Sequence, residues 1–478
     1  MSRTTVAAVV ADGLARAGAH RVFAAPGPTS AIVDAARAHG LAVVDVAGAA
    51  AACIMAAVCG ELDDAPGVAA VSLADGVTAV VDGAAHATRD RAPVVVLSDG
   101  AADARLLEPV AKASLVADAA SAAHWIAHAA QLSMAPPRGA VHLALRGDVA
   151  AAPTLPVATS CRRAPLAAAP PETLDALADA IAAAVRPVLV TGLEVTESDA
   201  TWVRALAETL PAPVLSTAKG KGAVPDPHPL ALGLLAAGHP LAARADLVVA
   251  LGVDPVEIAP GAWPAGARTV HVGTMPATEA LYRPEVDVVA EIGLVIEELA
   301  PRLRGRTGAD WDVAELDRLK RALTAPRTPG LTRRRVVGIV REATPAGTMA
   351  TLDVPLADAW QSVTPRELLI PNGVATAGFA LPAAVAAALA REERRVVAIG
   401  TASGILAMRA ELSSVARLAP RIVVVALDQD GATAALMEAA RTATLTTSLV
   451  EDEPGFAASF ARAWGSAQPA LLVARVRS

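Results

Sequence analysis

The sequence predicts an α/β protein made of three doubly wound domains, and two observations lead to this prediction. Short Val-rich runs alternate with Ala-rich stretches of helical period, which is typical of parallel sheets covered by helices on both faces. The 478 residues are also too many for one hydrophobic core of ordinary size. Because 54% of the residues are hydrophobic but only 2% are aromatic, the predicted cores depend on close packing of Ala, Val and Leu.

The first domain is expected over residues 1–155. A helical period near the N-terminus precedes a series of short apolar runs that predict strands, and these runs lie at residues 21–25, 42–45, 68–72, 93–98 and 140–145. Residues 151–171 are rich in Pro, Ala and Arg and follow neither period, so they predict a linker.

Two further domains are expected, over residues 172–305 and 330–478. Strands of the second are predicted at 187–191, 213–216, 246–251 and 269–272, and a helix is predicted at about 311–323. Strands of the third are predicted at 395–399, 421–427 and 470–475.

Composition and charge exclude several classes of function. The net charge of −7, with no basic stretch interleaved with aromatic residues, argues against a nucleic-acid partner. The longest weakly polar run, residues 46–60, is too short for a membrane span and is followed at once by acidic residues. No secretory leader is recognised, so we expect a cytoplasmic protein with no membrane partner and reduced cysteines.

Several collinear segments resemble one known family. They include "VFAAPG" at 22–27, "STAKGKGAVPDPHPLALG" at 216–233 and "NGVATAGFALPAAVAAALA" at 372–390. Together they resemble the thiamine-diphosphate enzymes of the acetolactate synthase, benzoylformate decarboxylase and oxalyl-CoA decarboxylase family. The resemblance implies a pyrimidine-binding-like, a central and a diphosphate-binding-like domain. It also implies a homodimer or a dimer of dimers, because the first domain of one subunit and the third domain of its partner enclose the cofactor in that family.

The resemblance places Ala49 where the family has the glutamate that activates the cofactor's pyrimidine. No carboxylate stands between Asp45 and Glu61. Asp45 is an alternative acid, but a role at the end of the strand or as a helix cap is favoured. The absence of the glutamate is not decisive by itself, because glyoxylate carboligase, in the same family, works with an apolar residue there.

A second departure concerns the metal that holds the diphosphate in the family. With Glu411 and Leu412 fixing the register, Ala402 stands where the acidic metal ligand of the Gly-Asp-Gly turn is expected. Asp428 and Gln429 stand in place of the family's paired asparagines. Asp428 or Asp430 remains a possible ligand, although a solvated turn that Gly431 permits is favoured. We therefore expect no metal site, and no thiamine diphosphate or magnesium.

Two residues are candidate catalysts in a remodelled cavity. Asp75 lies near the start of a predicted helix, where a carboxylate can be tuned as a base, and the alternative is a simple N-cap. His86 lies about three helical turns later, so neither residue can orient the other, and it is alternatively a packed or surface histidine. His124 and His128 have a spacing that can bind metal, but a solvated helix face is favoured.

Three hypotheses about function follow. The preferred one is a repurposed lyase or transferase that acts on a small carboxylate or carbonyl compound without thiamine diphosphate, because the whole domain set is retained. The second is a catalytically silent homologue that binds a ligand or serves as a partner subunit. The third is an atypical thiamine-diphosphate carboligase or decarboxylase. Relatives use the central domain for FAD or an ADP moiety, but neither is expected in this chain.

Overall fold

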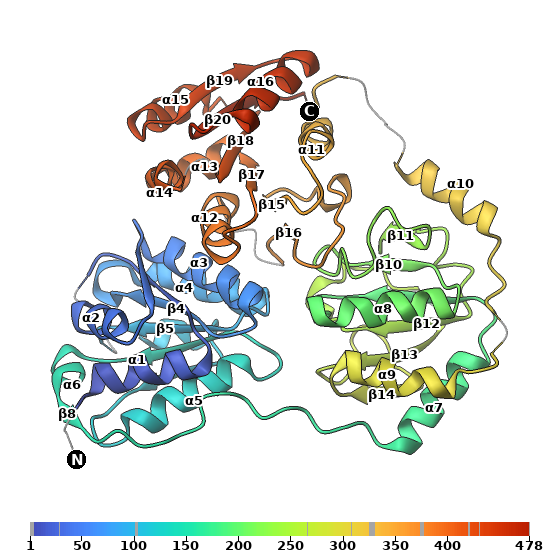
Figure 1. The fold of residues 1–478 in the computed structure, drawn as a ribbon, viewed down its shortest axis with the longest axis horizontal. Helices are drawn as coiled ribbons and strands as arrows, with labels where there is room; N and C mark the ends of the chain where they lie inside the picture. The colour runs from blue at the N-terminus through green and yellow to red at the C-terminus, as the bar shows by residue number, and fades with distance from the viewer. Residues whose placement is uncertain are drawn as a thin grey trace. The chain divides into compact units, whose positions relative to one another are not determined.

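The computed structural model describes residues 4–27, 29–100, 104–264, 266–306, 308–324, 330–372, 377–418, 421–429 and 431–477, apart from the side chain of Asp75. Three parallel sheets with covering helices follow one another along the chain (Figure 1). By its internal contacts the chain divides into two compact units. One contains residues 1–164, 350–354 and 371–476, and the other contains residues 165–349, 355–370 and 477–478.

The N-terminal sheet has the strand order β3-β2-β4-β5-β7-β6, and all its described pairs are parallel. Its strands are β2 (Arg21–Ala24), β3 (Ala42–Asp45), β4 (Gly67–Val71), β5 (Val94–Ser98), β6 (Ala113–Val116) and β7 (Ala140–Ala144). Its helices are α1 (Val6–Ala17), α2 (Ser30–Ala38), α3 (Ala49–Asp63), α4 (Leu73–Arg89), α5 (Ala122–Met134) and α6 (Gly147–Ala151). A small antiparallel pair joins β1 (Thr4–Thr5) to β8 (Pro153–Thr154).

The central sheet has the order β11-β10-β9-β12-β13-β14 and is also parallel. Its strands are β9 (Pro187–Thr191), β10 (Val214–Ser216), β11 (Ala231–Leu234), β12 (Leu247–Leu251), β13 (Arg268–Gly273) and β14 (Val286–Val289). The helices of this part are α7 (Pro171–Ala182), α8 (Glu197–Thr209), α9 (Ile292–Arg302), α10 (Val313–Thr324) and α11 (Arg333–Glu342).

The third sheet has the order β16-β15-β17-β18-β20-β19. Its strands are β15 (Met349–Leu352), β16 (Leu368–Leu369), β17 (Val396–Thr401), β18 (Ile422–Asp428), β19 (Thr446–Val450) and β20 (Ala470–Arg475). Its helices are α12 (Ala380–Ala390), α13 (Ala402–Ala407), α14 (Leu412–Arg417), α15 (Thr433–Thr442) and α16 (Glu453–Gly465).

The predicted α/β class with three parallel sheets is confirmed, while eight of the described strands were missed in the sequence. These are the two-residue strands β1, β8 and β16 and the longer strands β6, β11, β14, β15 and β19. The expected linker at 151–171 has no helix or strand between β8 and α7. In the described ranges, no helix combines the length and the apolar character that a bilayer crossing needs. A cytoplasmic location stays a prediction.

Helix α3 is buried on nearly every side, packing against β4 and α4 and, from the third domain, against α12 (Figure 1). Its small side chains allow backbone to meet backbone: a Cβ added at Gly67 would lie 1.8 Å from the carbonyl oxygen of Ala56. The helix also carries Cys53 and Cys59, both buried, and the Cys59 sulfur lies 3.7 Å from the carbonyl oxygen of Ala386 in α12. The N-terminal and C-terminal domains thus share one apolar helix contact.

An ion-pair cluster borders this helix contact. The Asp63 carboxylate lies 3.0 Å from the Arg391 guanidinium and 3.4 Å from that of Arg21. Arg21 also donates to the carbonyl oxygen of Leu389 at 2.5 Å. These interactions join the end of α3 to the end of α12.

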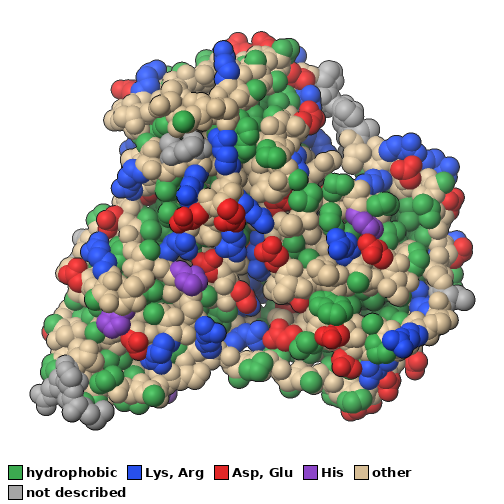
Figure 2. Space-filling model, viewed as in Figure 1, with side chains coloured by type: hydrophobic (Ala, Val, Ile, Leu, Met, Phe, Trp, Pro, Cys, Tyr) green, Lys and Arg blue, Asp and Glu red, His purple; other side chains and the backbone are tan. Residues whose placement is uncertain are grey.

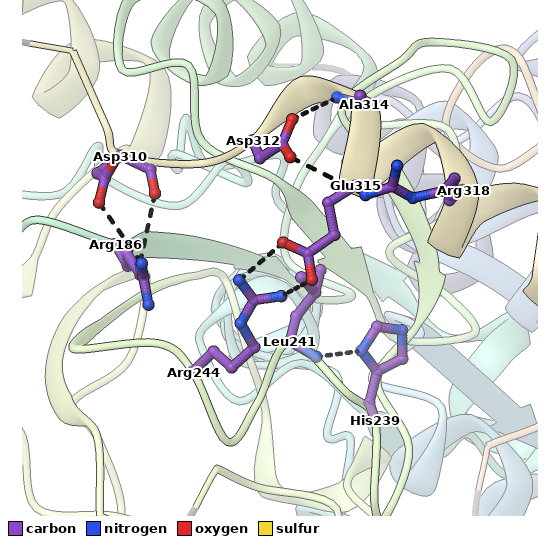
Figure 3. A network of polar contacts seen from close by, with 9 residues as sticks. All are labelled: Arg186, His239, Leu241, Arg244, Asp310, Asp312, Ala314, Glu315 and Arg318. Atoms are coloured by element: carbon purple, nitrogen blue, oxygen red, sulfur yellow. Dashed lines mark hydrogen bonds and ion pairs between the residues drawn. The ribbon is translucent and has the colours of Figure 1, made fainter.

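Helix α10 is bound to the central domain by a polar network (Figure 3). Arg244 donates to both carboxylate oxygens of Glu315, at 2.5 and 2.9 Å. Trp311, just before α10, donates its indole N–H to the carbonyl oxygen of Pro187 at 2.9 Å. On the face drawn in Figure 2, Lys and Arg side chains are interspersed with Asp and Glu rather than gathered into one basic patch.

Replacing Gly67 with Ala tests the backbone contact between α3 and β4. Because the neighbouring atoms are backbone atoms that cannot rotate away, Gly67→Ala is expected to lower the free energy of unfolding by about 3 kcal/mol or more. Gly147→Ala is the control, since a Cβ there meets nothing within 4 Å and its effect should stay within about 1 kcal/mol. Urea denaturation of both variants measures the difference, and equal stabilities would contradict the packing argument.

Candidate functional site

In parallel α/β sheets, ligands bind beyond the carboxyl ends of the strands. At this edge of the third sheet, β17 ends at Thr401 and the neighbouring β18 ends at Asp428. Thr401 pairs with Leu427, so Asp428 lies one residue further along the adjacent strand. Ala402 is the first residue of α13 and is fully buried. Two of the positions singled out in the sequence, Ala402 and Asp428, therefore lie at one sheet edge.

The Asp428 carboxylate is held inside its own turn. It accepts the N–H of Gly431 at 3.1 Å and the hydroxyl of Thr433. The expected turn is present, but Asp428 is only 3% exposed, so the expectation of a solvated acid is wrong. Gln429 is exposed, and Asp430 lies outside the described residues.

A second carboxylate, missed in the sequence, lies at the same edge. Asp353 directly follows β15 and accepts the backbone N–H of Thr401 at 3.1 Å. A Cβ added at Gly404 would lie 2.9 Å from Asp353 Oδ2, so the carboxylate packs closely over the first turn of α13. The sequence signal that could have identified Asp353 is an acidic residue directly after a strand, but strand β15 itself was not predicted.

Gly378, which lies shortly before α12, approaches the same turn. Gly378 has a φ of +82°, and a Cβ there would lie 2.3 Å from the carbonyl oxygen of Gly404. Residues 373–376 lie outside the described ranges. The close contact requires glycine at position 378, because both the backbone angle and the space exclude a side chain.

The oxygen atoms at this edge are of the kind that binds a hydrated divalent cation together with a diphosphate. Asp353 and Asp428 provide carboxylate oxygens on either side of Thr401, which adds a hydroxyl oxygen. Among the described residues, no group of three or more His, Cys, Asp or Glu side chains is arranged to hold a metal. Magnesium does not need such a cage, because it commonly takes one or two carboxylates and fills its remaining positions with phosphate and water.

At the N-terminal sheet, Ala49 is the first residue of α3. The helix has no acidic residue in its first turn, and its N-cap is Gly48. Asp45 ends β3, as one interpretation held, but it does not cap the helix. A carboxylate nevertheless reaches this helix end from the third domain, because Glu411 accepts the N–H of Ala47 at 2.8 Å.

Asp75 and His86 lie at opposite ends of α4. Asp75 is in the first helical turn, where the N-cap is Ser72, and its side chain lies outside the described part of the structure. His86 is fully buried, with its ring 5.1 Å from that of Phe379 and Nε2 3.7 Å from the Asp90 carboxylate. The two candidates do not share a site. A catalytic role for either residue stays a prediction.

His124 and His128 lie one turn apart on α5, as expected, and their rings stack with centroids 6.2 Å apart.

A half-buried acid that was not singled out in the sequence lies at the carboxyl edge of the central sheet. Glu257 accepts the N–H of Leu193 at 2.9 Å and the hydroxyl of Thr217. Burial is the main cause that raises the pKa of Glu257 to about 8.

Comparisons with known proteins cover most of the chain. Residues 4–118 match the thiamine pyrophosphate enzyme N-terminal TPP binding domain, residues 174–299 its central domain, and residues 350–472 its C-terminal TPP binding domain. The catabolic acetolactate synthase of Raoultella terrigena is 28% identical over 455 residues, covering 87% of this chain and 81% of that protein. The acetolactate synthase of Bacillus subtilis (strain 168) is 27% identical over 460 residues, covering 87% and 80%.

A solved structure shares the fold over the full length. The thiamine diphosphate-dependent 4-hydroxybenzoylformate decarboxylase of Rhodococcus jostii RHA1 has a TM-score of 0.81 and 21% identity, covering 99% of each chain.

The expectation that the cofactor site is degenerate and that thiamine diphosphate and magnesium are lost is therefore wrong. Both the N-terminal and the C-terminal parts match thiamine pyrophosphate binding domains. The same matches overturn the cofactor-free repurposed enzyme and the silent homologue as functions. The prediction had weighed position 402 and Asp428 but not Asp353, whose carboxylate lies at the same edge. The expectation about FAD or a nucleotide in the central domain stays a prediction.

The raised pKa of Glu257 predicts a dependence of stability on pH. Its ordinary value is 4.5 and its value in the folded chain is about 8, so the folded state binds an extra proton between these values. The stability that this proton contributes is fully present below about pH 4.5 and is lost as the pH rises through about 8. Glu257→Gln should therefore show a smaller loss of unfolding free energy than the wild type between about pH 5 and pH 9.

Glu315→Gln is the control for this measurement. Its hydrogen bond with Arg244 lowers the pKa of Glu315, so its titration falls below that pH window. Urea denaturation at a series of pH values compares the three proteins. A Glu257→Gln profile parallel to that of the wild type would show that Glu257 is ionised in the folded state.

Proposed function

Because the chain belongs to the thiamine pyrophosphate enzyme family, we propose that it is a thiamine-diphosphate-dependent carboligase or decarboxylase with an atypical cofactor site. The observation that carries the proposal is the oxygen-rich edge of the third sheet. There Asp353 follows β15, and Thr401 and Asp428 end the adjacent strands β17 and β18, close to Gly378 of the matched TPP binding domain.

In this proposal the residues of the third domain hold the diphosphate end of the cofactor. Asp428 and Asp353 would bind the divalent cation, and Gly378 would let the glycine-rich segment approach the first turn of α13. When bound, thiamine diphosphate would supply a nucleophilic carbanion for addition to a carbonyl group and a cationic thiazolium ring as an electron sink for decarboxylation.

The N-terminal domain would receive the pyrimidine end. Ala49 presents a methyl group where the family has a carboxylate, so this position contributes shape and exclusion of water instead of a negative charge. We expect the cofactor to be activated without a glutamate at position 49.

The substrate class that fits this chemistry is a small 2-oxo acid. Two relatives are named acetolactate synthases, and the structural neighbour is named a 4-hydroxybenzoylformate decarboxylase. A 2-oxo acid offers both a carbonyl group for addition and a carboxylate that can leave as carbon dioxide. The proposal includes a homodimer, since the family builds each cofactor site from the N-terminal domain of one subunit and the C-terminal domain of its partner.

Calorimetric titration with thiamine diphosphate, with and without magnesium, tests the cofactor. Saturable binding that needs magnesium is expected, followed by release of carbon dioxide from 2-oxo acids such as pyruvate and benzoylformate. Absence of binding together with absence of carbon dioxide release would overturn the proposal.

Asp428→Ala tests the metal-binding edge. Losing one of two carboxylate ligands is expected to weaken magnesium binding at least about tenfold, measured by titrating magnesium at a fixed cofactor concentration. The control is Asp34→Ala, because the Asp34 side chain is 76% exposed and lies on α2. Equal magnesium affinities in the two variants would remove Asp428 from the site.

A further inference from the structure

Two buried carboxylates, one in the N-terminal domain and one in the C-terminal domain, each accept a backbone N–H of the other domain. Asp90 of the N-terminal domain accepts the backbone N–H of Asn372 at 2.5 Å. Glu411 of the C-terminal domain accepts the backbone N–H of Ala47 at 2.8 Å. All four residues belong to the same compact unit of the chain.

Asp90 holds the first residue of the glycine-rich segment. It directly follows α4 as its C-cap and is 4% exposed. Beside it, the His86 ring packs against Phe379, which caps the start of α12. Asn372 is therefore held by a hydrogen bond, and Phe379 by a ring contact, from neighbouring residues of the N-terminal domain.

Glu411 holds the residues that lead into α3. It is 1% exposed, and its second oxygen accepts the hydroxyl of Ser414 at 3.0 Å. Ala47 lies two residues before Ala49, the position at which the family has its activating glutamate. A carboxylate from the third domain thus fixes the backbone at the pyrimidine end of the N-terminal domain.

We propose that Asp90 and Glu411 are reciprocal positioning residues, each fixing a cofactor-facing segment of the other domain. The proposal rests on the proposed function, because it assumes that these segments face thiamine diphosphate. A backbone N–H that loses its charged acceptor loses a strong hydrogen bond, so the segment that carries it shifts or becomes mobile. Asp90 therefore acts on the diphosphate end, and Glu411 acts on the pyrimidine end.

Asp63 provides the matched control, since it joins the same two domains without touching either segment. Asp63 is the last residue of α3, and its carboxylate binds Arg21 at the start of β2 and Arg391 at the end of α12. If the three carboxylates only hold the domains together, Asp63→Ala, Asp90→Ala and Glu411→Ala should change hydrogen exchange and cofactor binding to a similar extent. A positioning role predicts that only the last two variants change the cofactor-facing segments.

The first experiment is amide hydrogen exchange on the full-length protein without cofactor. Asp90→Ala should increase deuterium uptake in peptides covering residues 370–380, and Glu411→Ala should do so in peptides covering residues 44–50. Asp63→Ala should leave both regions as they are in the wild type. Uptake that rises equally in all three variants, or in none, would overturn the proposal.

The second experiment is binding of thiamine diphosphate with saturating magnesium, measured by calorimetry. Asp90→Ala should weaken binding about tenfold, corresponding to the loss of one charge-assisted hydrogen bond. Asp90→Asn and Glu411→Gln keep an oxygen acceptor, so each should recover most of what its alanine variant loses. Failure of this rescue would refute the assigned hydrogen bonds.

The two experiments separate this proposal from the proposed function. If the wild type binds no thiamine diphosphate, the proposed function fails, while hydrogen exchange still reports on the two carboxylates. If the wild type binds the cofactor and the alanine variants bind it equally well with unchanged exchange, the positioning role fails and the proposed function stands.

Discussion

Close backbone packing around α3 is the constraint on which the N-terminal and C-terminal domains depend. The helix lies between β4 and α12, and its contact with Gly67 leaves no room for even one methyl group. Small side chains let strongly apolar elements approach closely without aromatic rings, which make up only 2% of this chain. The Ala-rich composition is therefore the means by which two domains of one chain share a single buried contact.

The fold class follows from the sequence because buried parallel strands are runs of β-branched residues. The central strands β4, β5, β12 and β18 are such runs and were located to within one or two residues. The edge strands β6, β14 and β19 are partly exposed and mix polar with apolar residues, and the edge strand β11 contains no β-branched residue, so these sequences lack this signal. Strand β15 is buried but contains a single β-branched residue, and Asp353 was overlooked with it.

What the sequence could not provide was the three-dimensional neighbours of the positions that it singled out. The collinear motifs drew attention to Ala49, Ala402 and Asp428, and the structure has them at the first residue of α3, the first residue of α13 and the last residue of β18. Counting ligands along one motif led to the wrong conclusion about the cofactor and overlooked Asp353, which lies at the same sheet edge but follows a different strand. The contacts of Asp90 with Asn372 and of Glu411 with Ala47 join residues 282 and 364 positions apart, which no local pattern reveals.

Because the cysteines are buried, their alkylation can measure local opening of the chain. All three thiols are buried, and burial is the main cause that raises the pKa values of Cys53 and Cys59 to about 12. Thiols in this state react slowly with alkylating reagents, since the thiolate is the reactive form. Cys59 touches α12, and Cys161 packs against α1 and α5, so labelling of each would record a different opening event. Mass spectrometry after a pulse of iodoacetamide would then distinguish separation of the two domains from release of the segment that follows β8.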